Sequence, residues 1–194
     1  MDRFDRSHNT AVGQPLDAAL QLARQGDALG FNQLFHAHAD ALRGFARLRG
    51  AADPDELANT VLFDAFRSLA NFDGNASAFR SWVFRIARNK IVDAHRAAAA
   101  RPRSAGVTVT DADITPADGA DLTALHHLGI GHLAPAFDQL TDEQRELIVL
   151  RFVADLSLDE TAAALDKPLT AVKAMQRRAL ATLRRTISPE VVSR

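Results

Sequence analysis

The chain carries its densest run of cationic side chains near the C-terminus. Between Lys167 and Arg185 there are six Lys or Arg residues and no acid, a local charge of +6. Side chains three and four positions apart share one side of a helix, so this run can place charged groups against base edges and phosphates of duplex DNA. A helical hairpin with a solvated basic face is the alternative. The candidate duplex-reading residues are Thr170, Ala171, Lys173, Ala174, Arg177 and Arg178.

A second cationic run lies in the middle of the chain and has aromatic neighbours. From Arg85 to Arg103 six Lys or Arg residues oppose one Asp, a local charge of +5. Aromatic rings beside a basic helix can stack on single-stranded bases, and the polar loop Asp73–Ser77 can offer hydrogen bonds to an extruded base. For Phe79 and Trp82, packing in the core explains the pattern at least as well. The candidate single-strand-binding residues are Phe72, Asn75, Ser77, Arg85, Arg88, Asn89, Val92 and Arg96, of which the last five lie on one face of the predicted helix.

A third group of residues has the opposite charge. The segment that begins at Asp53 is acidic, and several of its polar and aromatic side chains lie outside its apolar stripe. A mixed acidic and apolar surface is suited to a protein partner. A helix that is merely solvated is the alternative. The candidate partner-binding residues are Asp55, Glu56, Asn59, Thr60 and Phe63.

Residues for catalysis or metal binding are weakly represented. The chain has no Cys, which excludes disulfides, thiolate zinc sites and thiol redox chemistry. His36 and His38 are two positions apart and point to different sides of a helix, and the cluster of His126, His127 and His132 lacks zinc-site spacing. No phosphate-binding loop or nucleophile motif is present. We therefore predict no catalytic residue, no metal and no cofactor.

The elements that position these groups are predicted to be helices, because Ala and Leu dominate the sequence and β-branched residues are sparse. Capping signatures mark three helix starts, at Asp53–Glu56, Thr141–Gln144 and Ser157–Glu160. The tight connection Asp166–Leu169 joins a short helix to a longer basic one, as in a helix-turn-helix. The predicted helices cover residues 16–24, 28–48, 54 to about 69, 78–99, 141–153, 157–165 and 170–187, with a poorly defined helix over 122–137.

Together these helices predict an all-α chain of two small domains joined by a flexible acidic linker. The expected division is a disordered N-terminus over 1–14, a first domain over 15–100, the linker over 101–121, a second domain over 122–188 and a tail over 189–194.

Charge and hydropathy bear on the DNA affinity of the protein and on its location in the cell. Ser104–Asp138 holds five Asp and no Lys or Arg, a local charge of −5, and the chain as a whole has a net charge of −1. This acidic part predicts weak DNA affinity for the protein alone. No apolar run approaches the roughly 20 residues of a membrane helix. The residues before Pro15 lack the apolar stretch of a secretory signal. We therefore expect a cytoplasmic protein without membrane insertion.

Three segments, in this order, resemble the extracytoplasmic-function (ECF) sigma factors of the sigma-70 family. Asp55–Arg67 is similar to the region-two segment that docks on the polymerase clamp, and Phe79–Asn89 to the helix that melts and recognises the −10 element. Leu165–Lys173 is similar to the turn and −35 reading helix of region four. The family commonly has Gly where Asp166 stands, and Asp tolerates the left-handed dihedral better than most residues.

The resemblance implies a function and its partners. The first domain would be sigma region 2 and the second sigma region 4, in a factor that directs RNA polymerase to promoters and catalyses nothing itself. The implied partners are core RNA polymerase, through its β′ clamp and β flap, promoter DNA and an anti-sigma factor. The partner-binding candidates would contact the clamp, the single-strand candidates the −10 element and the duplex candidates the −35 element. The sequence departs from the family's common residues at Asn59, Thr60, Ala171 and Ala174.

A one-component regulator, with a helical sensor domain and a helix-turn-helix, is the alternative function. Such a regulator binds its operator without polymerase and with a steep salt dependence. A sigma factor of this charge distribution is expected to bind duplex DNA weakly alone and to act with core enzyme. An enzyme is a third class, for which the sequence offers no motif.

Overall fold

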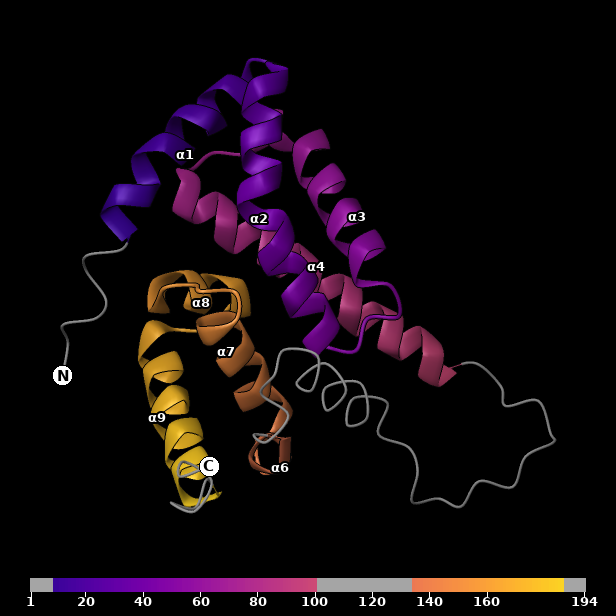
Figure 1. Cartoon of the computed structure of the whole chain (residues 1–194), viewed down its shortest axis with the longest axis vertical. Coiled ribbons are helices and arrows are strands. Elements are labelled where there is room, and N and C mark those ends of the chain that lie inside the picture. Colours follow the sequence, from indigo (N-terminus) through magenta and orange to yellow (C-terminus); the bar gives the residue numbers. More distant parts are fainter. Residues whose placement is uncertain (1–8, 101–133, 187–194) are drawn as a thin grey trace, which may run out of the picture.

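The computed structural model describes residues 9–100 and 134–186, and every regular element within these ranges is a helix (Figure 1). We call the two ranges the N-terminal bundle and the C-terminal bundle. The N-terminal bundle consists of α1 (Asn9–Arg24), α2 (Ala28–Leu48), α3 (Pro54–Arg67), the 3₁₀ turn η1 (Leu69–Asn71) and α4 (Ala76–Ala100). The C-terminal bundle consists of α6 (Ala134–Phe137), α7 (Asp142–Phe152), α8 (Leu158–Leu165) and α9 (Leu169–Thr186).

A tight hairpin of α1 and α2 opens the N-terminal bundle. Asp27 caps α2 by accepting a hydrogen bond from the backbone N–H of Leu29 at 2.7 Å. At Gly30 an added Cβ would lie 2.4 Å from the Ala23 nitrogen and 2.6 Å from the Ala19 carbonyl oxygen. Glycine is therefore required for the two helices to approach this closely.

Phenylalanine rings fill the core between α2, α3 and α4. Phe45 and Phe84 are fully buried and meet edge to face, with their ring centroids 5.7 Å apart. Burial of a side chain of this size contributes about 2–3 kcal/mol to the free energy of unfolding. The predicted start of α3 is confirmed, because an Asp53 carboxylate oxygen accepts the Glu56 N–H at 2.9 Å. One side of α4 packs against this core, and other sides of the helix are available for contacts outside the core.

The C-terminal bundle is shaped by local capping signals. Both predicted capping boxes are confirmed: Thr141 with Gln144 at the start of α7, and Ser157 with Glu160 at the start of α8. Asp166 ends α8 in the left-handed conformation, with φ of 53°. Its short polar side chain makes that conformation less costly than for most residues. The chain can therefore turn at once from α8 into α9.

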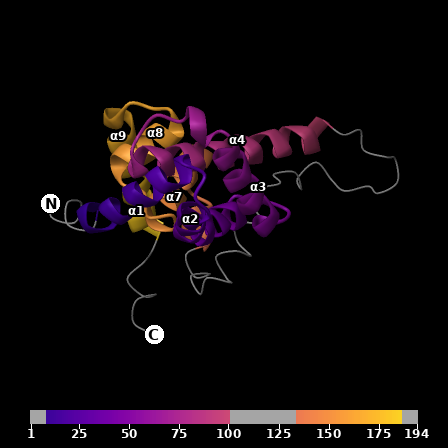
Figure 2. The same ribbon diagram turned by 90° about the horizontal axis from the view of Figure 1, so that it is seen from above.

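The two bundles pack against each other, mainly through α4 and α8 (Figures 1 and 2). The Ser77 hydroxyl of α4 donates to a Glu160 carboxylate oxygen at 3.0 Å, and Glu160 is buried. Arg80 of α4 donates to the carbonyl oxygen of Ala154, which lies between α7 and α8. Polar groups of the C-terminal bundle therefore meet the helix that carries the central cationic run.

Some helix bounds differ from the sequence predictions. Helix α1 begins at Asn9 rather than Leu16, although Pro15 inside it lacks the N–H of a regular helical residue and usually marks a boundary. Residues 9–14, expected to be disordered, are thus helical. The predicted linker, the first part of the helix over 122–137 and the tail lie outside the described residues.

Among the helices that the structure describes, none is both long and apolar enough to span a bilayer.

Candidate nucleic-acid and protein interfaces

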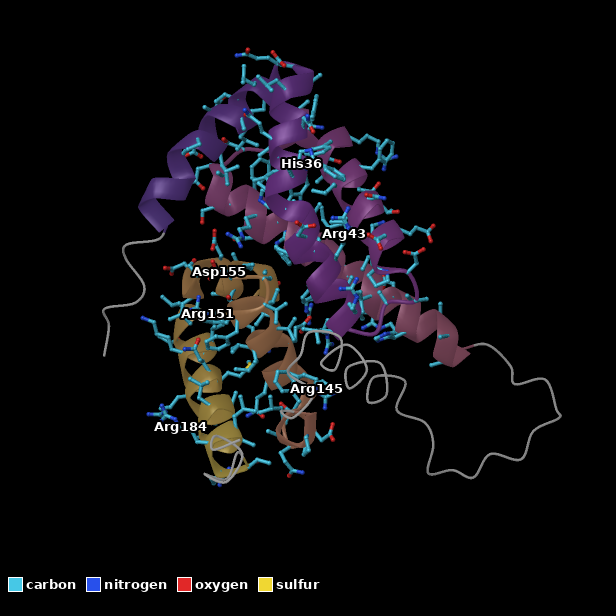
Figure 3. All side chains as sticks on the ribbon, in the orientation of Figure 1. His36, Arg43, Arg145, Arg151, Asp155 and Arg184 are labelled. Atoms are coloured by element: carbon cyan, nitrogen blue, oxygen red, sulfur yellow. The ribbon has the colours of Figure 1, made fainter. Side chains whose placement is uncertain are left out.

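The cationic face near the C-terminus lies on α9, opposite the side that packs in the C-terminal bundle. Val172, Met175 and Ala179 are buried against α7 and α8. In Figure 3 the side chain of Arg184 points outward from α9. Five of the predicted duplex-reading residues are exposed and Ala174 is half-buried; the exposed ones are Thr170, Ala171, Lys173, Arg177 and Arg178. This helix therefore presents its cations and early residues on an open surface.

A cavity of about 400 Å³ lies beside the loop that joins η1 to α4. Phe72 and Trp82 stack in its wall, with ring centroids 4.9 Å apart and an angle of 11° between their planes. Asp73 and Arg85 add polar groups to the lining. The core interpretation holds for Phe79, which is fully buried, whereas Trp82 is half-buried and lines the cavity. An aromatic wall with polar neighbours is suited to hold an unstacked base.

The predicted single-strand-binding residues of α4 fall into two groups. Arg85, Asn89 and Arg96 are exposed, and Val92 is half-buried. Arg88 is turned toward the C-terminal bundle, where its Nε lies 3.1 Å from a carboxylate oxygen of Glu146, whose side chain is only 6% exposed. The structure thus separates residues that the sequence had placed on one face.

The predicted loop residues also have partners within the protein. An Asn75 carboxamide oxygen accepts the N–H of Ala78 at 2.9 Å and caps the start of α4. Ser77 donates to Glu160 of α8, as described above. Phe72 is half-buried and stacks on Trp82.

Helix α3 presents all of the predicted partner-binding side chains to solvent, namely Asp55, Glu56, Asn59, Thr60 and Phe63. Phe63 is 65% exposed, and the Arg67 guanidinium lies 6.0 Å from its ring centre. Arg43 of α2, labelled in Figure 3, holds the start of α3, because its Nε lies 2.6 Å from an Asp55 oxygen. The exposed ring of Phe63 and the carboxylates of Asp55 and Glu56 thus lie on a surface that is open to a partner.

Helix α3 is also tied to α4 by an ion pair. The Lys90 ammonium lies 2.7 Å from an Asp64 oxygen. The hydrogen bond from Lys90 lowers the pKa of the Asp64 carboxyl below its usual value. This pair helps to fix the partner-binding candidates of α3 relative to α4.

Two residues that the sequence analysis did not single out reach the cavity loop from α1. The Arg24 guanidinium donates to the carbonyl oxygens of Phe72 and Gly74, and an Asp17 carboxylate oxygen accepts the N–H of Ala76. These contacts join residues 48 to 59 positions apart. No local sequence signal announces contacts of that range.

The histidines do not form a metal site in the described part of the chain. His36 is exposed, whereas His38 is buried with its Nδ1 2.7 Å from the Leu34 carbonyl oxygen. Burial lowers the pKa of His38 from 6.5 to about 4, so the ring is neutral at pH 7. Within residues 9–100 and 134–186, no group of three or more His, Asp or Glu side chains is arranged to hold a metal ion. The other predicted histidine cluster lies outside these ranges.

Comparison with known proteins finds two family models that match separate parts of the chain. Residues 34–101 match the family model Sigma-70 region 2, and residues 136–185 match the model Sigma-70, region 4. The chain is 31% identical to RNA polymerase sigma factor NccH of Alcaligenes xylosoxydans xylosoxydans, over 86% of this chain and 91% of that protein. It is 32% identical to ECF RNA polymerase sigma factor ShbA of Streptomyces griseus subsp. griseus, over 87% and 93% respectively.

Two further comparisons extend the likeness. ECF RNA polymerase sigma factor BldN of Streptomyces coelicolor is 28% identical over 87% of this chain, which spans 64% of the length of that relative. The solved structure of CnrH in complex with the cytosolic domain of CnrY superposes with a TM-score of 0.63 at 28% identity, covering 88% of this chain and 96% of that one.

Two helical bundles with these matches define a sigma-70-type initiation factor that has regions 2 and 4. The chain belongs to the ECF RNA polymerase sigma factors. It acts in promoter-specific transcription initiation, with core RNA polymerase and promoter DNA as its partners. Sigma factors are initiation factors and generally do not catalyse reactions. The findings favour this function over the one-component regulator.

Proposed function

We propose a division of labour among three surfaces. Helix α3 docks on the β′ clamp through Asp55, Glu56, Asn59, Thr60 and Phe63, and the C-terminal bundle binds the β flap while α9 reads the −35 duplex. The cavity and α4 hold the opened −10 strand. The observation that carries the proposal is the cavity beside the Phe72–Trp82 stack, because a base can enter it only after leaving the duplex.

The closed arrangement of the two bundles bears on how these surfaces act. Arg88 and Ser77 of the proposed −10 surface are engaged by Glu146 and Glu160 of the C-terminal bundle. Ala163 of α8 also lines the cavity. The bundles must therefore separate before these residues can contact DNA, and core polymerase would hold them apart.

A protein regulator fits this arrangement. The solved structure of CnrH contains the cytosolic domain of a second protein, CnrY. By this likeness we extend the proposal to an anti-sigma factor that keeps the protein from core polymerase. The protein itself would act in the cytoplasm and would catalyse no reaction.

Run-off transcription with core polymerase on a genomic library tests the function and finds the promoter. Phe63→Ala should reduce affinity for core polymerase about tenfold, because it removes an aromatic side chain of the size that dominates protein interfaces. Asn89→Ala should leave that affinity unchanged and impair strand opening, measured by the permanganate reactivity of unpaired thymines. The proposal fails if the purified chain has no affinity for core polymerase, or if it binds a closed operator alone with nanomolar affinity and sequence specificity.

A further inference from the structure

The loop beside the cavity is held by a side chain from another helix. One terminal nitrogen of the Arg24 guanidinium donates to the carbonyl oxygens of Phe72 and Gly74, each at 2.8 Å. The guanidinium carbon also lies 5.7 Å from the centre of the Phe72 ring. Arg24 therefore fixes both the backbone of the loop and the ring that stacks on Trp82.

The beginning of α4 is fixed from α1 in the same way. An Asp17 carboxylate oxygen accepts the N–H of Ala76, the first residue of α4, at 2.6 Å. Asn75 accepts the N–H of Ala78. Two of the N–H groups that a helix start leaves without helical partners are thus satisfied, one of them by a carboxylate that also complements the helix dipole.

The loop has little freedom to change shape between these two anchors. At Gly74 an added Cβ would lie 2.9 Å from both the Phe72 ring and the Ala78 side chain. The backbone is therefore packed closely around the Phe72 ring. A shift of either carbonyl that Arg24 holds would move the ring as well.

We propose that Arg24, assisted by Asp17, is a positioning residue for recognition of the −10 base. The inference rests on the proposed function, since it takes the cavity beside Phe72 and Trp82 as the site of an extruded base. Helix α1 sets the loop in its base-accepting shape before DNA arrives. The entropic cost of ordering the loop then does not reduce the free energy of binding of the base.

The test uses holoenzyme assembled from core polymerase and the full chain. The probe is the non-template −10 strand of a promoter found by run-off transcription, with each base replaced in turn by an abasic site. Positions where the abasic change weakens binding by the wild type identify the base held in the cavity. Arg24→Met should weaken binding of the intact strand about tenfold and should leave binding of that abasic strand unchanged. Arg47→Met, at the opposite end of α2 from α1, is the matched loss of charge and should behave as wild type.

Two substitutions of Asp17 test the hydrogen bond to the Ala76 N–H, because one keeps a side-chain oxygen as its acceptor and the other removes it. Asp17→Asn keeps a side-chain oxygen for the Ala76 N–H and should retain most of the base-dependent affinity. Asp17→Ala removes the oxygen and should lose about threefold, again only on the intact strand.

Two results would overturn the inference and leave the proposed function standing: Arg24→Met with wild-type base dependence, or equal weakening of the intact and abasic strands together with a lower melting temperature. A wild-type holoenzyme for which no abasic position weakens binding would overturn the proposed function of the cavity, and this inference with it.

Discussion

The cationic helices α4 and α9 have similar charge and different surroundings. Helix α9 buries the apolar residues of one side, such as its Val172 and Met175, against α7 and α8 of its own bundle. Helix α4 packs against the phenylalanine core on one side and against α8 on another. Its Arg88 forms an ion pair with Glu146, whose side chain is nearly buried. The surface that we propose for the −35 duplex is thus open in this arrangement, while part of the proposed −10 surface is covered.

Under the proposed function, packing between the bundles covers residues of one DNA-binding surface and leaves the other surface free. Glu146 and Glu160 are buried carboxylates, and a buried charge is costly unless it is paired or hydrogen-bonded. Arg88 and Ser77 meet that need in the closed arrangement. DNA phosphates would compete for the same Arg88. Under the proposed function, the polar contacts of Arg88 and Ser77 are therefore the ones that DNA would replace, whereas the apolar packing of α9 would be unchanged.

Among the proposed changes, a covalent cross-link between the two bundles should have the largest effect on transcription. The chain has no Cys, so Ser77→Cys with Glu160→Cys gives a pair that a short bismaleimide can join selectively. The cross-linked protein should lose promoter-specific transcription almost entirely, because the −10 surface stays covered. Run-off transcription measures the loss, and each single variant treated with the same reagent is the control. Full activity of the cross-linked protein would show that the bundles need not separate.

Removal of Arg88 should affect both the DNA contact and the closed arrangement. Arg88→Ala should reduce strand opening at the promoter about tenfold and keep the affinity for core polymerase. It also leaves Glu146 without its guanidinium partner, so the radius of gyration of the protein alone should rise in small-angle scattering. Arg85→Ala is the matched control, since this exposed residue should reduce opening without changing the radius. An unchanged radius of gyration in Arg88→Ala would show that the Arg88–Glu146 ion pair does not hold the two bundles together.

The buried His38 side chain should make the stability of the folded protein sensitive to acid. It lies edge-on to Phe79, with ring centroids 5.5 Å apart, and its pKa is lowered to about 4 by burial. The unfolded chain binds a proton at this residue below about pH 6.5 and the folded chain only near pH 4, so the free energy of unfolding falls as the pH drops through that window. Between pH 6.5 and pH 5 the loss should be about 2 kcal/mol.

Urea unfolding at pH 8 and pH 5 measures this loss. His38→Gln should reduce the difference between the two pH values, because the group that takes up the proton is gone. His36→Gln, at the exposed neighbouring histidine, should keep it. Equal pH dependence in wild type and His38→Gln would assign the acid sensitivity to other groups.

The smallest effect is expected on the open surface. Lys173→Ala should weaken −35 engagement by about 1 kcal/mol, roughly fivefold, and reduce the slope of affinity against salt by about one. Lys173 is exposed and its loss disturbs no packing, so the melting temperature should stay at the wild-type value. Filter binding of holoenzyme to promoter duplex across a salt series measures the change. A large loss of stability in this variant would contradict the description of α9 as an open face.

Much of the local structure could be predicted because its causes lie within a few residues. The capping boxes at Thr141 and Ser157, and the left-handed turn at Asp166, each depend on side chains up to three positions away. The predicted start of α1 at Leu16 was wrong, because the polar segment before it is helical from Asn9 and the helix continues through Pro15. The face of α4 was predicted as one surface because helical periodicity carries no information about which bundle will cover it.

By itself the sequence determined the all-helical class, the helix-turn-helix and the two separate cationic runs, because helix propensity, capping and charge are properties of neighbouring residues. Only the tertiary structure decided which cations remain exposed. It paired Arg88 with Glu146, 58 positions away, and brought Arg24 to the cavity loop, 48 positions away from Phe72. Contacts of that range arise when apolar faces of distant helices pack together, and only then do the polar groups at their edges meet.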